Sequence, residues 1–350
     1  MPDHRRHVDG NWNIQGNSPI LRSERMLLRE CSYFIVGGAG FIGSHFVDTL
    51  LASPLTRRVT LFDNFSSGRE WHYAHHAGNP RLTIIRADAS DVRALTATIE
   101  GHDWVIHLAS NPDIALAAQN PEIDFYRGTL LTNNVVEAMR RAHVRRLIYA
   151  SGSGVYGDAG AQRVREDFAP MRPVSTYGAS KLAGEALIAS YCAMFDLQAC
   201  AFRFGNVVGA RQTHGVGYDF LRRLRAKPSR LSILGDGQQS KPYIHVSDVV
   251  DAVLCAAKAA GGGFSVFNVA TEDAVTVTEI AEMAAAVLGL PAKPAFDYSG
   301  GRCGWRGDVP VVRLDSTRIR ALGWFPKRNS REAVCTSLKE LAADERALAN

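Results

Sequence analysis

Residues 33–45 read Tyr33-Phe34-Ile35-Val36-Gly37-Gly38-Ala39-Gly40-Phe41-Ile42-Gly43-Ser44-His45. A β-branched and aromatic run, then spaced glycines, then a helical pattern predicts a strand, a tight turn and a helix start. The first glycine permits the turn, the second lets the backbone approach a phosphate, and the third lets helix and strand pack closely. The free N–H groups of the helix start would face an anion. The stretch predicts a dinucleotide pyrophosphate site, with a plain turn as the alternative.

Composition is that of an ordinary globular protein. The 350 residues are 46% hydrophobic and 21% charged, enough to bury a large core. The formal charge of +5 suits small anions as well as nucleic acid, but basic residues form no stripe, so we expect no nucleic acid partner. No stretch approaches the length of a membrane span, and we expect no membrane partner. Six cysteines without a CxxC pair favour reduced thiols in a cytoplasmic protein.

Two local features predict no further function. Residues 1–25 are polar and lack an apolar core of signal-peptide length, so we expect a disordered extension, with Met26 as an alternative start. The eleven histidines show no metal-ligand spacing such as HExxH, and His75-His76 is interpreted as a solvated loop pair. We therefore expect no metal site.

Strand and helix patterns alternate through the first two hundred residues. This alternation predicts an α/β fold with a doubly wound, Rossmann-type parallel sheet that helices cover on both faces. We expect strands near 33–37, 58–62, 82–86, 104–108, 146–150 and 199–204, and helices near 41–51, 91–99, 126–142 and 177–195.

The second predicted strand ends in Asp63, twenty residues after Gly43. An acidic side chain at this place accepts hydrogen bonds from the adenosine ribose and repels a 2′-phosphate, which favours NAD over NADP. The alternative is that Asp63 caps the turn at residues 64–68. Arg69 is a second reservation, because a nearby arginine could bind a 2′-phosphate.

Tyr177 and Lys181 open the long predicted helix. They are four residues apart and therefore lie on one helix face. A phenol has a pKa near ~10, and a neighbouring ammonium stabilises the phenolate and lowers that pKa. Tyr177 could then take a proton from an alcohol while hydride leaves the same carbon. Taken alone, the pair would be interpreted as exposed helix surface. Because it follows a dinucleotide-binding motif in the same chain, it predicts a catalytic role.

These residues together resemble the extended short-chain dehydrogenase/reductase family, in its nucleotide-sugar epimerase and dehydratase branch. The resemblance covers residues 32 to 340 and implies NAD as cofactor and a nucleotide sugar as substrate. The landmarks are the glycine-rich turn, Asp63-Asn64-Phe65-Ser66-Ser67-Gly68, His107-Leu108-Ala109, Val155-Tyr156-Gly157-Asp158, and Tyr177 with Lys181.

The resemblance, with the strand ends, gives the expected binding residues. For the cofactor these are Gly37, Gly40, Phe41, Ile42, Gly43, Asp63, Asn64, Ser66, Ser67, Gly68, Asp88, Ala89, Leu108, Ala109, Ser110, Ser151, Tyr177 and Lys181. For the substrate they are Ser153, Tyr177, Asn206, Arg211, Lys241, Arg306 and Asp308, with Lys241 in the place of a phosphate-binding arginine.

The resemblance also implies a division of the chain. Residues 26–204 would form the NAD-binding domain, with a helix and strand inside 246–270 returning to it. Residues 205–245 and 271–345 would form most of a smaller C-terminal substrate lobe. By analogy with family dimers we expect a homodimer.

One departure from the family concerns the reaction. A serine or threonine usually stands three residues before the valine of Val-Tyr-Gly and bonds the reacting hydroxyl, but here that residue is Gly152. Ser151 and Ser153 flank it, and Ser153 is our preferred replacement as a catalytic residue beside Tyr177 and Lys181. The alternative is that Tyr177 acts alone.

The same strand end distinguishes the family's reactions. The 4,6-dehydratases carry an Asp-Glu pair before Val-Tyr-Gly, and the decarboxylases a glutamate, whereas this chain has Ser153 and Gly154. We therefore expect an NAD-dependent epimerase that acts at C4 through a transient 4-keto intermediate, with Tyr177 as acid and base. A dehydratase, a decarboxylase, a 4-keto reductase and a non-catalytic dinucleotide-binding protein remain the alternatives.

Overall fold

The computed structural model describes residues 30–111, 114–259 and 261–348. The extension predicted at residues 1–25 lies outside this part of the chain, as does Met26.

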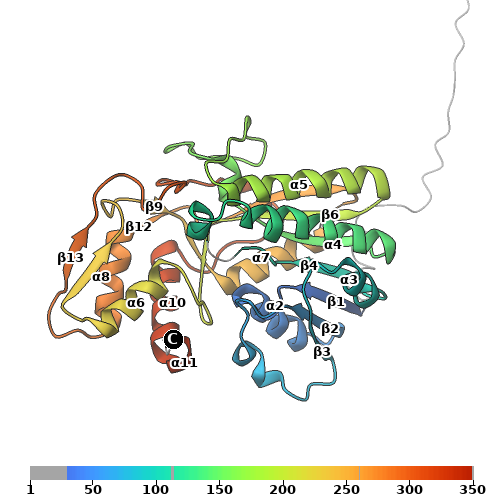
Figure 1. Cartoon of the computed structure of the whole chain (residues 1–350), viewed down its shortest axis with the longest axis horizontal. Helices are drawn as coiled ribbons and strands as arrows, with labels where there is room; N and C mark the ends of the chain where they lie inside the picture. Colours follow the sequence, from blue (N-terminus) through green and yellow to red (C-terminus); the bar gives the residue numbers. More distant parts are fainter. Residues whose placement is uncertain (1–29, 112–113, 260, 349–350) are drawn as a thin grey trace, which may run out of the picture.

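Seven parallel strands form one sheet (Figure 1). The strand order reverses between β1 and β4, and sheets of this kind bind ligands outside the carboxyl ends of the strands at such a switch point. The predicted Rossmann-type doubly wound sheet is confirmed. In spatial order the strands are β11 (Phe264–Val269), β6 (Gln198–Phe204), β5 (Arg146–Gly152), β4 (Trp104–His107), β1 (Cys31–Val36), β2 (Thr56–Asp63) and β3 (Leu82–Arg86).

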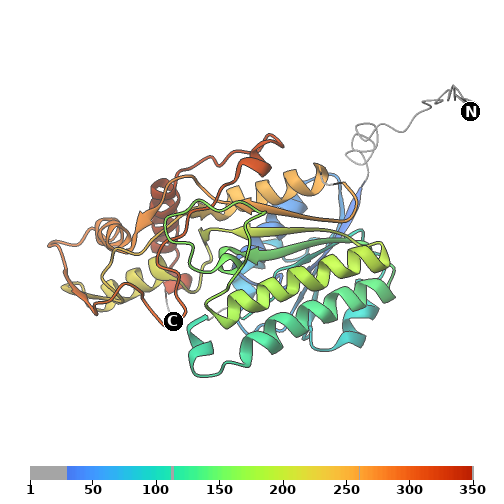
Figure 2. The ribbon, with the colours of Figure 1, turned by 90° about the horizontal axis from the view of Figure 1, so that it is seen from above.

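Helices cover both faces of this sheet (Figure 2). One face carries α2 (Phe41–Ala52) and α7 (Val246–Ala259), and the other carries α3 (Val92–Ile99), α4 (Leu130–Arg141) and α5 (Thr176–Phe195). Because successive strand side chains point to opposite faces, the hydrophobic run of β1 is buried on both sides. Ile35 packs in the core with α2 and α7, whereas Phe34 and Val36 pack in the core with α4 and α5.

The helix predicted over 126–142 differs in its first turn. It begins with a π-helical turn, η4 (Phe125–Thr129), before α4 starts at Leu130. Gly128 in this turn lies against α5, where a Cβ would come within 2.0 Å of the Ser180 hydroxyl oxygen. Hydrophobic periodicity does not distinguish a π turn from an α turn, so the sequence pattern predicted one continuous helix.

The C-terminal elements pack around a third core, which includes Tyr218, Leu221, Leu224, Ile280 and Leu338. They lie on the left of Figure 1. Their bounds are α6 (Val216–Ala226), β8 (Arg230–Ile233), α8 (Val277–Val287), β13 (Ala295–Tyr298), α10 (Ser330–Ala343) and α11 (Glu345–Leu348). The short helix α9 (Thr317–Arg320) instead contacts β11, and its Ile319 lies in the core shared with α2 and α7. The short strands pair as β7 (Asn206–Val208) with β10 (Tyr243–His245), and β9 (Ser240–Lys241) with β12 (Val275–Thr276).

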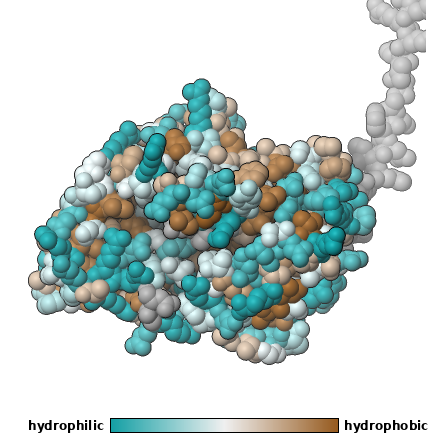
Figure 3. Space-filling view, in the orientation of Figure 1, coloured by the Kyte–Doolittle hydropathy of each residue, from teal (hydrophilic) through white to brown (hydrophobic). Residues whose placement is uncertain are grey.

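The face drawn in Figure 3 is predominantly hydrophilic, with hydrophobic residues in scattered groups. Within the described ranges, no helix combines the length and the apolar character that crossing a membrane requires.

Candidate active site

A cleft of about 680 Å³ opens at the carboxyl edge of the sheet and reaches the C-terminal elements. Most predicted site residues line it. These are Gly37, Gly40, Phe41, Ile42, Gly43, Asp63, Asn64, Ser66, Ser67, Asp88, Ala89, Leu108, Ala109, Ser110, Ser151, Ser153, Tyr177, Lys181, Asn206, Lys241 and Asp308. Gly68, Arg211 and Arg306 do not line it.

The glycine-rich turn is closely packed. Gly37 has a φ of +83°, and a Cβ on it would lie 2.8 Å from the backbone nitrogen of Ala109. A Cβ on Gly43 would lie 2.5 Å from the carbonyl oxygen of Gly37. Helix α2 begins after Gly40 with neither a side-chain cap nor an acidic residue in its first turn. Its first N–H groups are therefore available to an anion, as a bound pyrophosphate requires.

Asp63 lies at the end of β2 with its carboxylate turned back toward the turn. One oxygen accepts from the Ala39 amide at 2.9 Å and the other from the Phe65 amide at 2.7 Å. Burial raises the pKa of Asp63, and these amides oppose the rise. The residue thus caps the turn and also lines the cleft. Arg69 does not line the cleft, and its guanidinium donates to the Gly68 carbonyl.

Tyr177 and Lys181 lie on one face of α5, whose N-cap Ser175 accepts a hydrogen bond from Gly178. The Lys181 ammonium donates to the Ala150 carbonyl oxygen at 2.7 Å and lies 5.5 Å from the centroid of the Tyr177 ring. Burial lowers the pKa of Lys181 to about 8.

The sequence-based expectation that Lys181 lowers the Tyr177 pKa is not met. Burial is the largest influence and raises the pKa of Tyr177, while a hydrogen bond with the Ser110 side chain lowers it. The Lys181 ammonium donates its hydrogen bond to the Ala150 carbonyl oxygen.

The strand end at Gly152 has room for a side chain. Gly152 is extended, with a φ of −165°, and a Cβ on it would meet no atom within 4 Å. The Ser151 hydroxyl donates to Glu185 at 2.5 Å, and Glu185 pairs with Arg203 at 2.6 Å. Ser151 is therefore bound to a buried ion pair. Ser153 begins the short helix η5 (Ser153–Tyr156) and lines the cleft.

The far end of the cleft carries an ion pair. The Lys241 ammonium lies 2.6 Å from an Asp308 carboxylate oxygen, and the Asp308 side chain is almost fully buried. Trp305 lines the cleft, with the Lys241 ammonium 5.0 Å from its ring centroid.

Arg211 makes a different contact from the one predicted. Its guanidinium donates to Asp48 of α2 at 2.5 Å, and Gln212 and His214 line the cleft in its place. Gln212 and His214 were not predicted from the sequence, and neither were Trp305, Tyr126 and Arg127. Trp305 could have been found beside Arg306-Gly307-Asp308, whereas the others follow no spacing rule.

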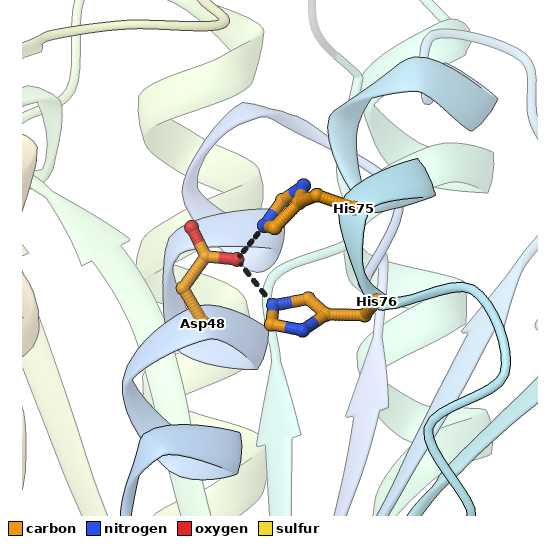
Figure 4. A group of neighbouring side chains, drawn as sticks. All are labelled: Asp48, His75 and His76. Carbon is orange, nitrogen blue, oxygen red and sulfur yellow. Dashed lines mark hydrogen bonds and ion pairs between the residues drawn. The ribbon is translucent and has the colours of Figure 1, made fainter.

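Asp48 also holds the histidine pair (Figure 4). The Nε2 atoms of His75 and His76 lie 2.7 and 2.8 Å from the same Asp48 oxygen. His75 is exposed and His76 is half-buried in the short helix η2 (Ala74–His76), so the pair is open to solvent as predicted but is also bound to Asp48. Among the residues that the structure describes, these three are the group with metal-ligand geometry, but the Arg211 guanidinium already neutralises the carboxylate. None of the three lines the cleft.

A glycine-rich turn at the switch point of a doubly wound sheet is typical of dinucleotide-binding enzymes. The model of the NAD dependent epimerase/dehydratase family matches residues 33–270, and the chain belongs to that family. A curated UDP-glucose 4-epimerase from Mycolicibacterium smegmatis is 33% identical, covering 87% of this chain and 96% of that protein.

Two solved structures are similar over their whole length. One is a UDP-galactose 4-epimerase with 38% identity and a TM-score of 0.79, covering 89% of this chain and 98% of that chain. The other is MoeE5 in complex with UDP-glucuronic acid and NAD, with 31% identity and a TM-score of 0.78, covering 89% and 99%.

Proposed function

We propose that this protein is an NAD-dependent epimerase that inverts C4 of a UDP-linked sugar. The family and the 4-epimerases named above support this reaction. The observation that carries the proposal is a single cleft that contains the glycine-rich turn, Tyr177 with Lys181, and the Lys241–Asp308 pair.

The cofactor end of the cleft fits NAD. The close packing of Gly37 and Gly43 and the uncapped start of α2 leave backbone N–H groups for the pyrophosphate. The Asp63 carboxylate lines the cleft where the adenosine ribose of NAD would bind, and Arg69 does not. NAD, when bound, supplies an acceptor that takes a hydride from the sugar carbon and returns it.

Tyr177 moves the proton. Its phenolate oxygen takes the proton of the sugar's O4 hydroxyl while the C4–H bond breaks, which leaves a 4-keto sugar. The phenol returns that proton to O4 as the C4–H bond re-forms on the opposite face. The sugar is isomerised without net oxidation, so no outside oxidant or reductant is consumed. Lys181 is placed to hold the nicotinamide ribose and to keep positive charge near the phenolate.

The substrate end would bind the nucleoside diphosphate. Lys241 supplies the positive charge, and Asp308 fixes the position of its ammonium. Asn206 lines the same region and offers an amide donor to a phosphate oxygen. Trp305 is 40% exposed and presents a ring on which the uracil could stack.

The site lacks the acidic residues that the elimination of water by a dehydratase would require. Ser153 and Gly154 both line the cleft, so the places where a dehydratase would carry its acidic pair offer no carboxyl group. This favours epimerisation over loss of water.

Product analysis tests the proposal. The purified protein would be incubated, without added NAD, with UDP-glucose, UDP-galactose, UDP-N-acetylglucosamine and UDP-glucuronic acid. We expect a mixture of C4 epimers of unchanged mass for at least one sugar, by NMR and mass spectrometry. Loss of water would indicate a dehydratase and loss of carbon dioxide a decarboxylase. No conversion of any sugar would indicate a binding protein or a 4-keto reductase, which needs a keto sugar and a reduced cofactor.

We also propose that the protein is a cytoplasmic homodimer with two domains. The seven-stranded sheet and the third core support a division into residues 26–204 with 246–270, and 205–245 with 271–345. Exposed apolar side chains on η4 and at the end of α5, Phe125, Met194 and Phe195, support a partner on that side of the molecule.

A further inference from the structure

Asp48, His75 and His76 bring three potential metal ligands to one point outside the cleft (Figure 4). Asp48 lies on α2, and the two histidines end the short helix η2. The Nε2 atoms of both imidazoles point at the same Asp48 oxygen, and the three ligand atoms lie within 4.8 Å of one another. The group therefore joins segments that are 27 and 28 residues apart in the chain.

The separation of these atoms is close to the separation in a zinc site. Zn²⁺ binds imidazole nitrogen and carboxylate oxygen at about 2.0–2.2 Å, which places two ligand atoms of a tetrahedral site about 3.3 Å apart. The nitrogen–oxygen distances here are 2.7 and 2.8 Å. Opening each distance by about 0.5 Å would make room for the ion. Small side-chain rotations can supply this change, because none of the three side chains is fully buried.

Each of the three residues can present a free electron pair to a metal. Neutral histidine carries its proton on either ring nitrogen, so Nε2 becomes free when the proton moves to Nδ1. Burial acts to raise the pKa of Asp48, but hydrogen bonds from Arg211, His76 and His75 lower it overall, so the carboxylate is ionised. Two imidazole nitrogens and one carboxylate oxygen form a ligand set that suits Zn²⁺.

Arg211 leaves the shared ligand atom available. Its guanidinium donates to Oδ2 of Asp48, whereas both histidines contact Oδ1. The positive charge of Arg211 weakens the attraction of a cation to this carboxylate, so the site should bind less tightly than a structural zinc site with four ligands. The side chains of His75 and Asp48 are 48% and 28% exposed, so a water molecule can complete the tetrahedron.

We propose that Asp48, His75 and His76 bind one Zn²⁺ ion, with water as its fourth ligand. Mg²⁺ and Ca²⁺ prefer oxygen ligands and should bind poorly here. The ion would fasten η2 to α2, the helix that begins at the glycine-rich turn, and would stabilise the fold without taking part in the sugar reaction, because none of the three residues lines the cleft. Sequence spacing predicted no metal site because the carboxylate and the histidines come from distant segments.

Zinc titration of the whole chain, prepared without a histidine tag, tests the site. By calorimetry and by competition with a chromogenic chelator, the parent should bind one Zn²⁺ per chain at this site, with a Kd in the micromolar range. His75→Gln and His76→Gln each keep an amide donor for Asp48 but lose a ligand. Each should weaken binding at least about tenfold, and the double variant should lose the site.

The matched control is His143→Asn. His143 is an exposed histidine after α4 with a φ of 56°, a backbone conformation that asparagine also tolerates. This variant should bind Zn²⁺ with the affinity of the parent. The control is needed because the chain has eleven histidines, any of which could take up the ion weakly.

Two further readouts distinguish ligation from loose attraction. In ¹⁵N-histidine-labelled protein, NMR should show the ring proton of His75 and His76 moving from Nε2 to Nδ1 as zinc is added, with the resonances assigned from the single variants. Zinc should also raise the thermal unfolding midpoint of the parent, because the ion binds the folded chain, and should leave that of the double variant unchanged.

Three results would overturn the proposal. The first is a parent that binds no Zn²⁺. The second is a double variant that binds Zn²⁺ as tightly and in the same number as the parent, which would place the ion on other residues. The third is bound zinc that leaves the protons of both rings on Nε2. Because the site lies outside the cleft, a parent that epimerises no sugar would contradict the proposed function and leave this proposal standing.

Discussion

Burial and two neighbouring residues shift the pKa of Tyr177 in different directions. Burial raises the pKa of the phenol, the Ser110 hydroxyl lowers it, and the Asp124 carboxylate raises it. Asp124 is itself held by Asn111 and Thr176, at 2.9 and 2.7 Å. The phenol is therefore protonated more readily in this site than in water, so the base has to be favoured by groups that contact its oxygen or by the bound cofactor.

Replacing Tyr177 with phenylalanine tests the acid and base role. The variant keeps the ring but loses the proton-transferring oxygen, so kcat should fall by roughly 10²- to 10⁴-fold. Bound dinucleotide, released by denaturation and measured by its absorbance, should match the parent. An unchanged rate would show that another group moves the proton.

The buried Glu185–Arg203 ion pair should contribute to the stability of the fold. Both side chains are less than 5% exposed, and Arg203 also donates to the Tyr156 hydroxyl. Glu185→Leu should lower the free energy of unfolding by about 3–5 kcal/mol, because it leaves an unpaired buried charge. Urea denaturation measures this loss.

The matched control for that variant is Glu282→Gln, which breaks an exposed pair with Lys293 and should cost less than about 1 kcal/mol. Equal losses in the two variants would contradict the assigned burial of Glu185.

At the scale of elements, the short helix η1 (Glu70–His72) supports the dinucleotide turn. The buried His72 donates from Nδ1 to the Ala39 carbonyl oxygen at 2.7 Å, and the Arg69 amide donates to the same oxygen at 3.1 Å. The loop after β2 is thereby tied to the turn that precedes α2. The ring must stay largely neutral there, because burial lowers the pKa of His72 to about 4.

This contact predicts a pH dependence of stability. Between about pH 6.5 and 4 the unfolded chain binds a proton at His72 that the folded chain does not. The free energy of unfolding should therefore decrease as the pH is lowered through this range, by up to about 1.4 kcal/mol per pH unit from this residue. Above pH 6.5 the contribution should be constant.

Urea midpoints at several pH values measure this slope. His72→Gln, which keeps a donor but cannot titrate, should show a smaller slope than the parent. Identical slopes would mean that folding does not lower the pKa of His72, which would contradict this account.

The elements themselves were largely predictable, since their signals are local. The hydrophobic runs predicted all six strands of the first two hundred residues. The strand expected inside 246–270 is β11, which joins the same sheet. The π turn at Phe125–Thr129 was missed because hydrophobic periodicity does not distinguish a π turn from an α turn. The contact of Arg211 with Asp48 was missed because it joins residues far apart in the chain.

The candidate site shows the same division. The glycine-rich turn, Asp63, Tyr177 and Lys181 have fixed spacings, and the structure brings them to one cleft. The Ser110 side chain, which follows β4, lowers the pKa of Tyr177 at the start of α5, and burial raises that pKa. Neither effect can be predicted from the spacing of residues in the sequence.

At the scale of the whole molecule, the cleft lies where the sheet meets the C-terminal elements, and contacts beside it join the two. Arg211 bonds to Asp48 of α2, and the neighbouring Ala210 amide donates to Glu340 of α10 at 2.9 Å. The proposed dimer would place its partner on η4 and the end of α5. Sedimentation equilibrium should give twice the chain mass of 38.1 kDa.

Introducing charge at that surface tests the interface. Met194 is 70% exposed, and Met194→Glu should weaken the dimer and shift the measured mass toward that of one chain. Met194→Leu, the control, should not. A parent protein that sediments as a monomer at micromolar concentration would contradict the proposal.

The fate of the hydrogen at C4 tests the central claim most directly. The purified protein would be incubated, without added dinucleotide, with a UDP-hexose that carries deuterium at C4, chosen from the sugars it converts. If hydride is taken from C4 and returned within one turnover, the C4 epimer should form with the deuterium retained at C4, as NMR and mass spectrometry would show. Exchange of that deuterium with solvent, or a product lacking water, would contradict epimerisation through a 4-keto sugar.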